Sequence, residues 1–416
     1  MLKRCLGHYA LVFFILFPGC YAPASKSADL SSPESGPSLG KTSWEKVASG
    51  TPDRVLSQEG TFAVTLPRRG IVLALTRWGS TTIAVLNVAT GMLTALATAE
   101  TGEVGASLAG ERLAYLVRKG AYPANNHVEI LNLRRKTRQL VEPAGDFAIL
   151  GFALSPSGSQ LSYSEINLRW SGSRRSYWRI GVADLDKDDT HVLVASRNED
   201  RPDEGVPIPF AWSSGRQEIY LQRLLPFRGM VTHGIWAMKP EGPGLRKVLP
   251  EPSYTGLPRL SPDGDLLAYL AANVDALPRD YIPEPGSPPG NALMVMSPRT
   301  GEETLWAQKI GSAFGVFTWS PAENEILVTR QEWRGGRFRD AAFVRIGKET
   351  ARELRKIALP PMRKVTDIHV CRRGPLFWVE EDKSGASLQG DGAGPEPMTY
   401  LTLPEGKIKL IGCLGE

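Results

Sequence analysis

The sequence has little of what usually builds metal sites, nucleic-acid interfaces or helical bundles. It contains four cysteines and five histidines in 416 residues, and its formal net charge is only +5. The four histidines after the first twenty residues stand at no spacing typical of a metal site, so we expect no metal and no cofactor. A nucleic-acid partner is excluded because such proteins usually show a strongly basic face. No sustained helical periodicity follows residue 20, which excludes a helical fold.

Long apolar runs are also missing. The longest apolar run near the N-terminus extends from Tyr9 to Phe17, behind Lys3 and Arg4, and it is too short to span a bilayer. The order of charged, apolar and small residues predicts a signal peptide over 1–19. Residues 17–20, Phe-Pro-Gly-Cys, are similar to a bacterial lipobox, which predicts lipidation of Cys20; the alternative is an ordinary signal peptide with an incidental cysteine. A stretch rich in Ser, Pro and Gly follows, so 20–50 are expected to form a flexible tether and 51–416 a single folded domain.

The chain contains one sequence motif repeated seven times: an apolar stretch, a Ser-Pro-Asp-Gly-like turn and a strand of alternating apolar and polar residues. Successive copies begin roughly 45–60 residues apart, a period typical of propeller blades. A second strand, a tight turn and a third strand follow each copy, which predicts four-stranded antiparallel units named A to D from the axis outward. We therefore predict an all-β fold, a seven-bladed β-propeller; six or eight blades are the alternatives. The copies are 62–77, 106–118, 152–165, 210–223, 259–271, 317–330 and 368–381.

The copy at 260–269, Leu-Ser-Pro-Asp-Gly-Asp-Leu-Leu-Ala-Tyr, is close to a known signature. It resembles the WD-repeat-like propellers of the TolB type, which are periplasmic proteins of bacteria. The copies at 154–158 and 319–322 follow the same pattern with one or two departures. The resemblance implies the fold and a place in the cell envelope. It implies no activity, because propellers carry many functions.

Three details of the ring are predicted from this layout. Residues 53–57 read as an outer strand that would close the ring by pairing with the last blade. The Gly-rich segment 384–397 is expected to be a mobile loop. Cys371 would lie on the A–B turn face and Cys413 at the end of the last outer strand, so the two are expected to remain free thiols.

The loops between strands B and C are long and rich in arginine and aromatic residues, the types enriched at binding hot spots. In repeat proteins, insertions tend to fall on the binding face. We therefore predict a recognition surface for an envelope protein, a peptide or an anionic glycan, with solvated loops as the competing interpretation. Tyr281 belongs to the same set of loops. The predicted partner-binding residues are Arg169, Trp170, Arg174, Arg175, Tyr177, Trp178, Phe227, Arg228, Trp333, Arg334, Arg337 and Phe338.

The sequence thus favours a monomeric, non-catalytic binding or scaffold protein of the bacterial cell envelope. It would be exported and anchored by lipid to the outer membrane, facing the periplasm. The alternative is a propeller enzyme, a carbohydrate lyase or hydrolase, with a site at the mouth of the central channel. That alternative predicts His and carboxylate groups that converge on the axis with shifted pKa values. A third possibility is a propeller that serves mainly as a spacer.

Overall fold

The structure is a computed structural model, and the chain is described here from residue 56 to residue 414. The following residues within that span are left out: 62–65, 68, 100–104, 119–125, 168–176, 197–204, 214, 226–230, 243, 250–254, 282–289, 322–323, 358, 361, 373–374 and 392–396. The described part contains strands and one short 3-10 helix, η3 (Val274–Ala276). No helix in this part is long and apolar enough to cross a membrane.

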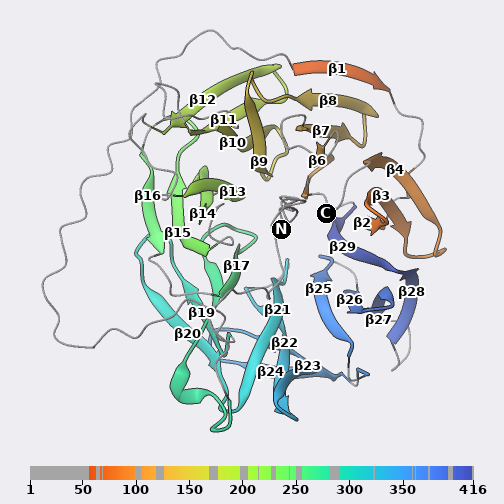
Figure 1. The fold of residues 1–416 in the computed structure, drawn as a ribbon, viewed down its shortest axis with the longest axis vertical. Coiled ribbons are helices and arrows are strands. Elements are labelled where there is room, and N and C mark those ends of the chain that lie inside the picture. The colour runs from red at the N-terminus through yellow and green to blue at the C-terminus, as the bar shows by residue number, and fades with distance from the viewer. Residues whose placement is uncertain are drawn as a thin grey trace, which may run out of the picture.

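The strands form seven antiparallel sheets that stand around a common axis (Figure 1). This confirms the predicted seven-bladed β-propeller of four-stranded blades. In chain order the strands are β1 (Leu56–Thr61), β2 (Gly70–Arg77), β3 (Ser80–Asn87), β4 (Leu93–Ala99), β5 (Ala106–Ala109), β6 (Arg112–Arg118), β7 (Asn126–Asn132), β8 (Thr137–Val141), β9 (Phe147–Leu154), β10 (Gln160–Asn167), β11 (Trp178–Asp184), β12 (Asp189–Ala195), β13 (Val206–Ser213), β14 (Glu218–Leu225), β15 (Val231–Met238), β16 (Arg246–Leu249), β17 (Thr255–Leu260), β18 (Leu267–Ala271), β19 (Ala292–Met296), β20 (Glu303–Gln308), β21 (Ser312–Trp319), β22 (Ile326–Arg334), β23 (Arg337–Ile346), β24 (Ala351–Lys356), β25 (Lys364–Val370), β26 (Leu376–Asp382), β27 (Gly385–Asp391), β28 (Pro397–Pro404) and β29 (Gly406–Cys413).

Both faces of each sheet are buried, because every blade packs between two others. In β2, Ile71 and Leu73 belong to a core cluster shared with Phe377 of blade 7. Val72, which points to the opposite face, belongs to a cluster shared with Leu113 of blade 2. Successive side chains of one strand therefore pack into two different cores, one on each face of the sheet. A repeat without its neighbours would leave both faces exposed and would be unstable.

The Ser-Pro-Asp-Gly motif forms the turn between strands A and B, as predicted. Between β17 and β18, the hydroxyl of Ser261 donates to Asp263 Oδ1 at 2.5 Å and accepts from the Leu266 N–H at 2.9 Å. Gly264 has φ +79°, and a Cβ there would lie 2.3 Å from Ser213 Oγ of the preceding blade. Glycine is required because the turn needs left-handed backbone and close contact with its neighbour.

Blade 1 is assembled from both ends of the chain, which the sequence did not predict. The last strand, β29, is its innermost strand and pairs with β2, while β3 and β4 complete the sheet. Both edges of β2 are thus occupied, by β29 and β3; residues 62–65 and 68 of the predicted first copy lie outside the described part of the chain. Of the segment 53–57, residues 53–55 lie outside the described part of the chain; for residues 56 and 57 the predicted pairing with blade 7 is wrong. β1 instead pairs with β8 and adds a fifth, outer strand to blade 2.

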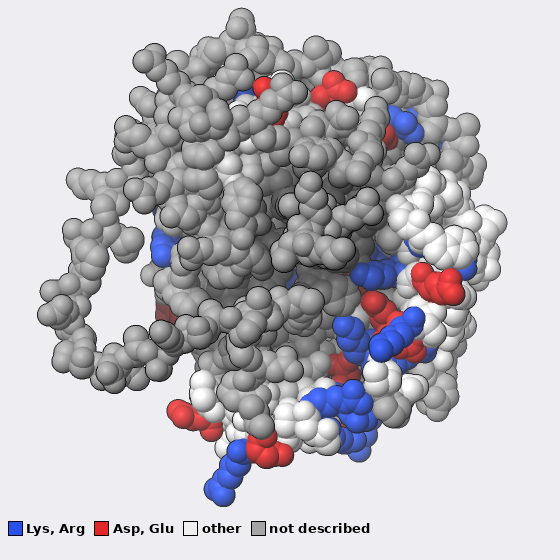
Figure 2. All heavy atoms as spheres, viewed as in Figure 1, with Lys and Arg blue, Asp and Glu red and all other residues white. Residues whose placement is uncertain are grey.

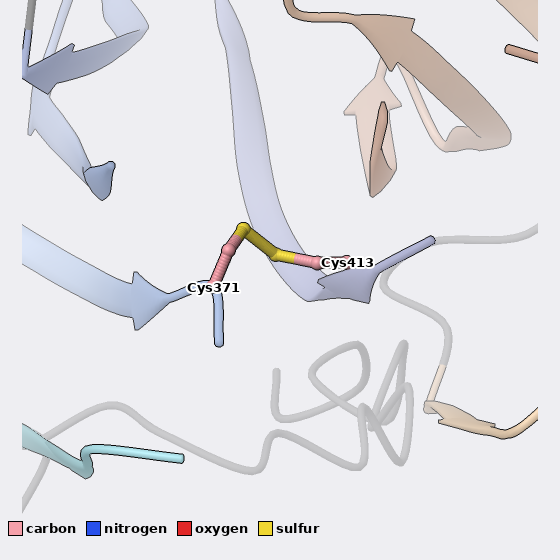
Figure 3. The surroundings of a disulfide bond; sticks show 2 residues. All are labelled: Cys371 and Cys413. Atoms are coloured by element: carbon pink, nitrogen blue, oxygen red, sulfur yellow. A yellow bond between two sulfur atoms is a disulfide. The ribbon is translucent and has the colours of Figure 1, made fainter. Parts of the chain in front are cut away.

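The prediction of two free thiols is wrong. Cys371 directly follows β25, the innermost strand of blade 7, and Cys413 ends β29, the innermost strand of blade 1. Their Cα atoms are 5.8 Å apart and their sulfur atoms form a disulfide (Figure 3). The error came from placing Cys413 on an outer strand. β29 closes the ring and is therefore an inner strand at the axis. Both cysteines thus lie at the same end of two neighbouring inner strands.

The mobile loop predicted for 384–397 is also wrong for the part that the structure describes. Residues 385–391 form β27, which pairs with β26 on one side and β28 on the other. Ala386 and Leu388 of this strand are 2% and 0% exposed. Burial between two sheets outweighs the weak strand propensity of a Gly-Ala-Ser sequence.

Candidate functional site: the loop face of blades 5 to 7

The connections between strands B and C and between blades emerge together on one side of the ring, here called the loop face. Seven of the residues predicted to act from the loops or the N-terminus lie outside the described part of the chain. These are Cys20, Arg169, Trp170, Arg174, Arg175, Phe227 and Arg228. The remaining six predicted residues, from blades 3 and 6, can be placed.

Tyr177 and Trp178 of blade 3 lie in the core. They are 3% and 1% exposed and pack between blades 3 and 4. Their backbone N–H groups both donate to the Ser196 hydroxyl, at 2.7 and 3.0 Å. The alternating pattern of β11 extends back to these residues, so their rings fill the interior and do not contribute to an exposed recognition surface.

The four predicted residues of blade 6 lie together at the tip of the β22–β23 hairpin. Trp333 and Phe338 face each other across the hairpin, with ring centroids 5.0 Å apart in a T-shaped arrangement. Tyr281 of blade 5 contacts both rings, with centroid distances of 5.4 and 5.9 Å. The Trp333 indole N–H donates to Asp280 Oδ2 at 2.9 Å. Two blades thus hold one aromatic cluster in a fixed geometry, as edge-to-face packing favours.

Exposed aliphatic side chains extend this cluster, and the sequence analysis missed them. Val274, Ile310 and Met362 are 71%, 80% and 60% exposed. The segments that carry them adjoin the cluster: the Gly311 N–H donates to the Ala276 carbonyl at 3.1 Å, and Arg337 Nη1 lies 3.7 Å from Met362 Sδ. We call the set Val274, Tyr281, Ile310, Trp333, Phe338 and Met362 the apolar patch.

Charged groups of both signs border the apolar patch. Arg334 lies 2.5 Å from Glu332 and, together with Arg330, holds the pKa of that carboxyl below its usual range. Arg337 has no carboxylate partner among the described residues, and Lys309 is exposed at the edge. Figure 2 shows acidic and basic side chains interspersed over the sector of blades 6 and 7 on one face of the ring. Such a rim adds directed contacts around an apolar centre.

A second group of polar residues lies on the innermost strands. Asp367 and His369 occupy alternate positions of β25, and Arg259 on β17 is close enough to act on both. Burial raises the pKa of Asp367 and lowers that of His369 to about 4, and Arg259 lowers both. Both carboxylate oxygens of Asp367 accept backbone N–H groups, from Ile368 at 3.0 Å and Leu410 at 2.9 Å.

His369 is one of the four histidines counted in the sequence analysis, which did not single out Arg259 or Asp367. Asp367 and His369 are two residues apart on β25, a strand that lies at the axis. This spacing becomes informative only when the inner strands are known. Within the described residues, no three His, Cys, Asp or Glu side chains are grouped so that they could hold a metal ion.

Comparisons with known proteins agree on the fold. No protein-family model and no curated protein matches the chain. Solved structures do: tricorn protease has 13% identity and a TM-score of 0.50, over 84% of this chain and 36% of its own. A TolB protein from Agrobacterium tumefaciens has 12% identity and a TM-score of 0.42, over 82% and 91%. An oligogalacturonate lyase in complex with manganese has 14% identity and a TM-score of 0.46, over 84% and 96%.

The class of the protein follows from the sheets themselves: it is a seven-bladed β-propeller. The chain spans 36% of tricorn protease and 50% of a prolyl endopeptidase that it also matches. At these identities the likeness concerns the fold alone.

Proposed function

We propose that this protein acts by binding, and that its partner is a protein segment that docks on the apolar patch. The observation that supports this is the grouping of Val274, Ile310 and Met362, each more than half exposed, around the aromatic cluster of blades 5 and 6. Scattered exposed apolar residues are ordinary, but a contiguous group with a polar rim is typical of an interaction site.

The partner segment is expected to be amphipathic and acidic. Apolar side chains would cover the patch, and a carboxylate would pair with Arg337, which lacks an acidic neighbour in the described part of the chain. Arg334 is less available because Glu332 already binds it. A protein segment is therefore favoured over an anionic glycan, which would leave the aliphatic groups exposed to water.

The cellular setting is part of the same proposal. The protein would be exported, lipidated at Cys20 and held at the outer membrane facing the periplasm. The Cys20→Ser variant would then move to the soluble fraction of the envelope. Retention of this variant in the membrane fraction would contradict lipid as the sole anchor.

The docking test uses the full-length protein in three forms. These are the wild type, the patch variant Val274→Ser/Ile310→Ser/Met362→Ser, and the control Met92→Ser/Met398→Ser, whose two residues are 59% and 46% exposed elsewhere. Each form is used to capture proteins from envelope extract, and the captured partner is then purified and titrated calorimetrically. We expect the three substitutions together to weaken binding by about 10- to 100-fold, or about 1.4–2.8 kcal/mol, because a few side chains of an interface carry most of its binding energy. Equal affinity for all three forms would contradict the proposal.

A second candidate function is catalysis at the axis, which the convergence of Arg259, Asp367 and His369 favours. The enzyme would be a carbohydrate lyase or hydrolase. Against it, the Asp367 carboxylate is already engaged by two backbone N–H groups and so is poorly placed to exchange protons with a substrate. Turnover of polygalacturonate by the wild type, abolished in His369→Ala, would favour this candidate over binding.

A further inference from the structure

The hairpin between β2 and β3 of blade 1 presents a single tryptophan on the loop face. Trp78 is 77% exposed. Its indole N–H donates to Glu405 Oε2 at 3.2 Å, and the Arg77 guanidinium carbon lies 3.8 Å from the ring centroid. One edge and one face of the ring are therefore held in place, and the ring is fixed although most of it contacts solvent.

The backbone at this site is strained. Trp78 has φ +50° and Glu405 has φ +52°, and both are left-handed non-glycine residues. Such a conformation costs about 1–2 kcal/mol for an L-residue, and hairpin turns of this kind normally use Asn, Asp or Gly. Two strained residues 327 positions apart in the chain meet in one hydrogen bond. Strain of this sort persists where a functional geometry requires it.

The surroundings of Trp78 are polar, unlike those of the apolar patch. The hydroxyls of Thr76 and Thr81 lie 2.8 Å apart beneath the turn. Met92 and Leu93, the other exposed apolar residues of blade 1, lie beyond the opposite end of β3. A protein hot spot would be expected within a wider apolar area.

We propose that Trp78, Arg77 and Glu405 form a stacking site for a pyranose ring of a glycan. The C–H groups on one face of a pyranose carry partial positive charge, and they would pack against the negative face of the indole. The pyranose would pack on the face of the indole that Arg77 leaves free, and Glu405, which lies at the edge of the indole, would supply an acceptor for the sugar hydroxyls. A cationic ligand is disfavoured because the Arg77 guanidinium already lies over the ring.

This site is independent of the protein-docking proposal, because it lies on blade 1 and shares no residue with the apolar patch. A pre-fixed aromatic ring lowers the entropy lost on binding, which matters for a small, weakly binding ligand. The site would allow the propeller to hold a polysaccharide strand while a protein occupies blades 5 and 6.

The test titrates the full-length protein calorimetrically with three probes: cellohexaose, N-acetylchitohexaose and hexagalacturonate. We expect at least one to bind the wild type, and Trp78→Asn to weaken that binding at least about tenfold, or about 1.4 kcal/mol. Arg77→Gln should weaken the binding of every probe that binds the wild type, because it removes the group that packs on the other face of the indole. Met92→Ala is the matched control and should bind like the wild type.

A stability measurement separates this role from a structural one. Asparagine tolerates left-handed backbone, so Trp78→Asn should keep or raise the melting temperature while sugar binding is lost. A marked fall in melting temperature would assign Trp78 to the fold instead. Absence of binding by all three probes, or equal binding by wild type and Trp78→Asn, would overturn the proposal. Loss of protein capture by Trp78→Asn without any sugar binding would overturn it as well.

Discussion

Blades 6 and 1 lie on either side of blade 7, and they are attached to it in related but unequal ways. On one side, Asp340 of blade 6 accepts the Val365 N–H of β25 at 2.8 Å. On the other, Asp367 of blade 7 accepts the Leu410 N–H of β29 at 2.9 Å. Burial raises the pKa of both aspartates. At both contacts of blade 7, with blade 6 and with blade 1, a buried carboxylate of one blade therefore accepts a backbone N–H from the inner strand of the next blade.

Only the seam with blade 1 also has a covalent bond, Cys371–Cys413. Blade 6 is built from four consecutive strands, whereas β29 is joined to the rest of blade 1 only by pairing with β2. If β29 shifted, the ring would open there. The difference teaches that the composite blade is the one that needs a fixed end, and the disulfide supplies it.

The largest expected effect comes from removing that bond. The double variant Cys371→Ser/Cys413→Ser should lower the free energy of unfolding by about 4 kcal/mol, because the bond closes a loop with a sequence separation of 42. Guanidinium denaturation, with and without reductant, measures this. Hydrogen exchange should become faster in β29 and β2 and stay unchanged in β22 and β23. An equal increase in the hydrogen-exchange rates of blades 1 and 6 would contradict the proposed difference between them.

A smaller effect should follow from acid at the same seam. Burial lowers the pKa of His369 to about 4, so the unfolded chain takes up a proton near pH 6.5 while the folded chain does not until about pH 4. The free energy of unfolding therefore falls as the pH drops through this window, by on the order of 3 kcal/mol. The raised pKa of Asp367 acts in the opposite direction.

His369→Gln isolates the histidine contribution. The melting temperature of this variant should fall less than that of the wild type between pH 6.5 and pH 4. If the melting temperatures of the wild type and His369→Gln fell in parallel with pH, His369 would not be the cause of acid sensitivity at the contact of blades 7 and 1.

The smallest effect concerns the two hairpins on the loop face. The blade 6 turn uses Gly335 and Gly336, with φ of +60° and +77°, where blade 1 has Trp78 and Gly79. Gly335→Ala should cost about 1 kcal/mol because only the backbone is affected: no atom lies closer than 4.0 Å to the added Cβ. Gly242→Ala is the control, since its Cβ also meets nothing and its φ is not left-handed. Equal melting temperatures would mean that this turn tolerates side chains freely, and that Trp78 is not strained.

The sequence predicted the parts of the fold that local chemistry determines. The turn around Ser261 to Gly264 is specified by its own side chains, so the copies predicted the blade count and the strand order of blades 2 to 6. Ring closure is not local. Nothing in Gly406–Cys413 indicates that it pairs with Gly70–Arg77 at the other end of the chain. The disulfide prediction failed for the same reason.

The candidate site was predictable to a similar degree. Trp333 and Phe338 flank a Gly-Gly turn, so their position at a hairpin tip could be read from the sequence. Val274, Ile310 and Met362 could not, because each is a single apolar residue in a different connection. Trp78 carried a signal that the sequence analysis did not use, since a Trp-Gly pair between two alternating strands marks a tight turn with an unusual first residue.

The fifth strand of blade 2 has a mechanical consequence. β1 begins at Leu56 on the outer rim and lies along β8, from Leu56 opposite Val141 to Thr61 opposite Thr137. Tension applied to the chain ahead of Leu56, as an anchor would apply it, reaches this pair before any other pair of strands that the structure describes. β1 can peel away and leave four strands in blade 2, so the rim would yield under load while the ring keeps its shape.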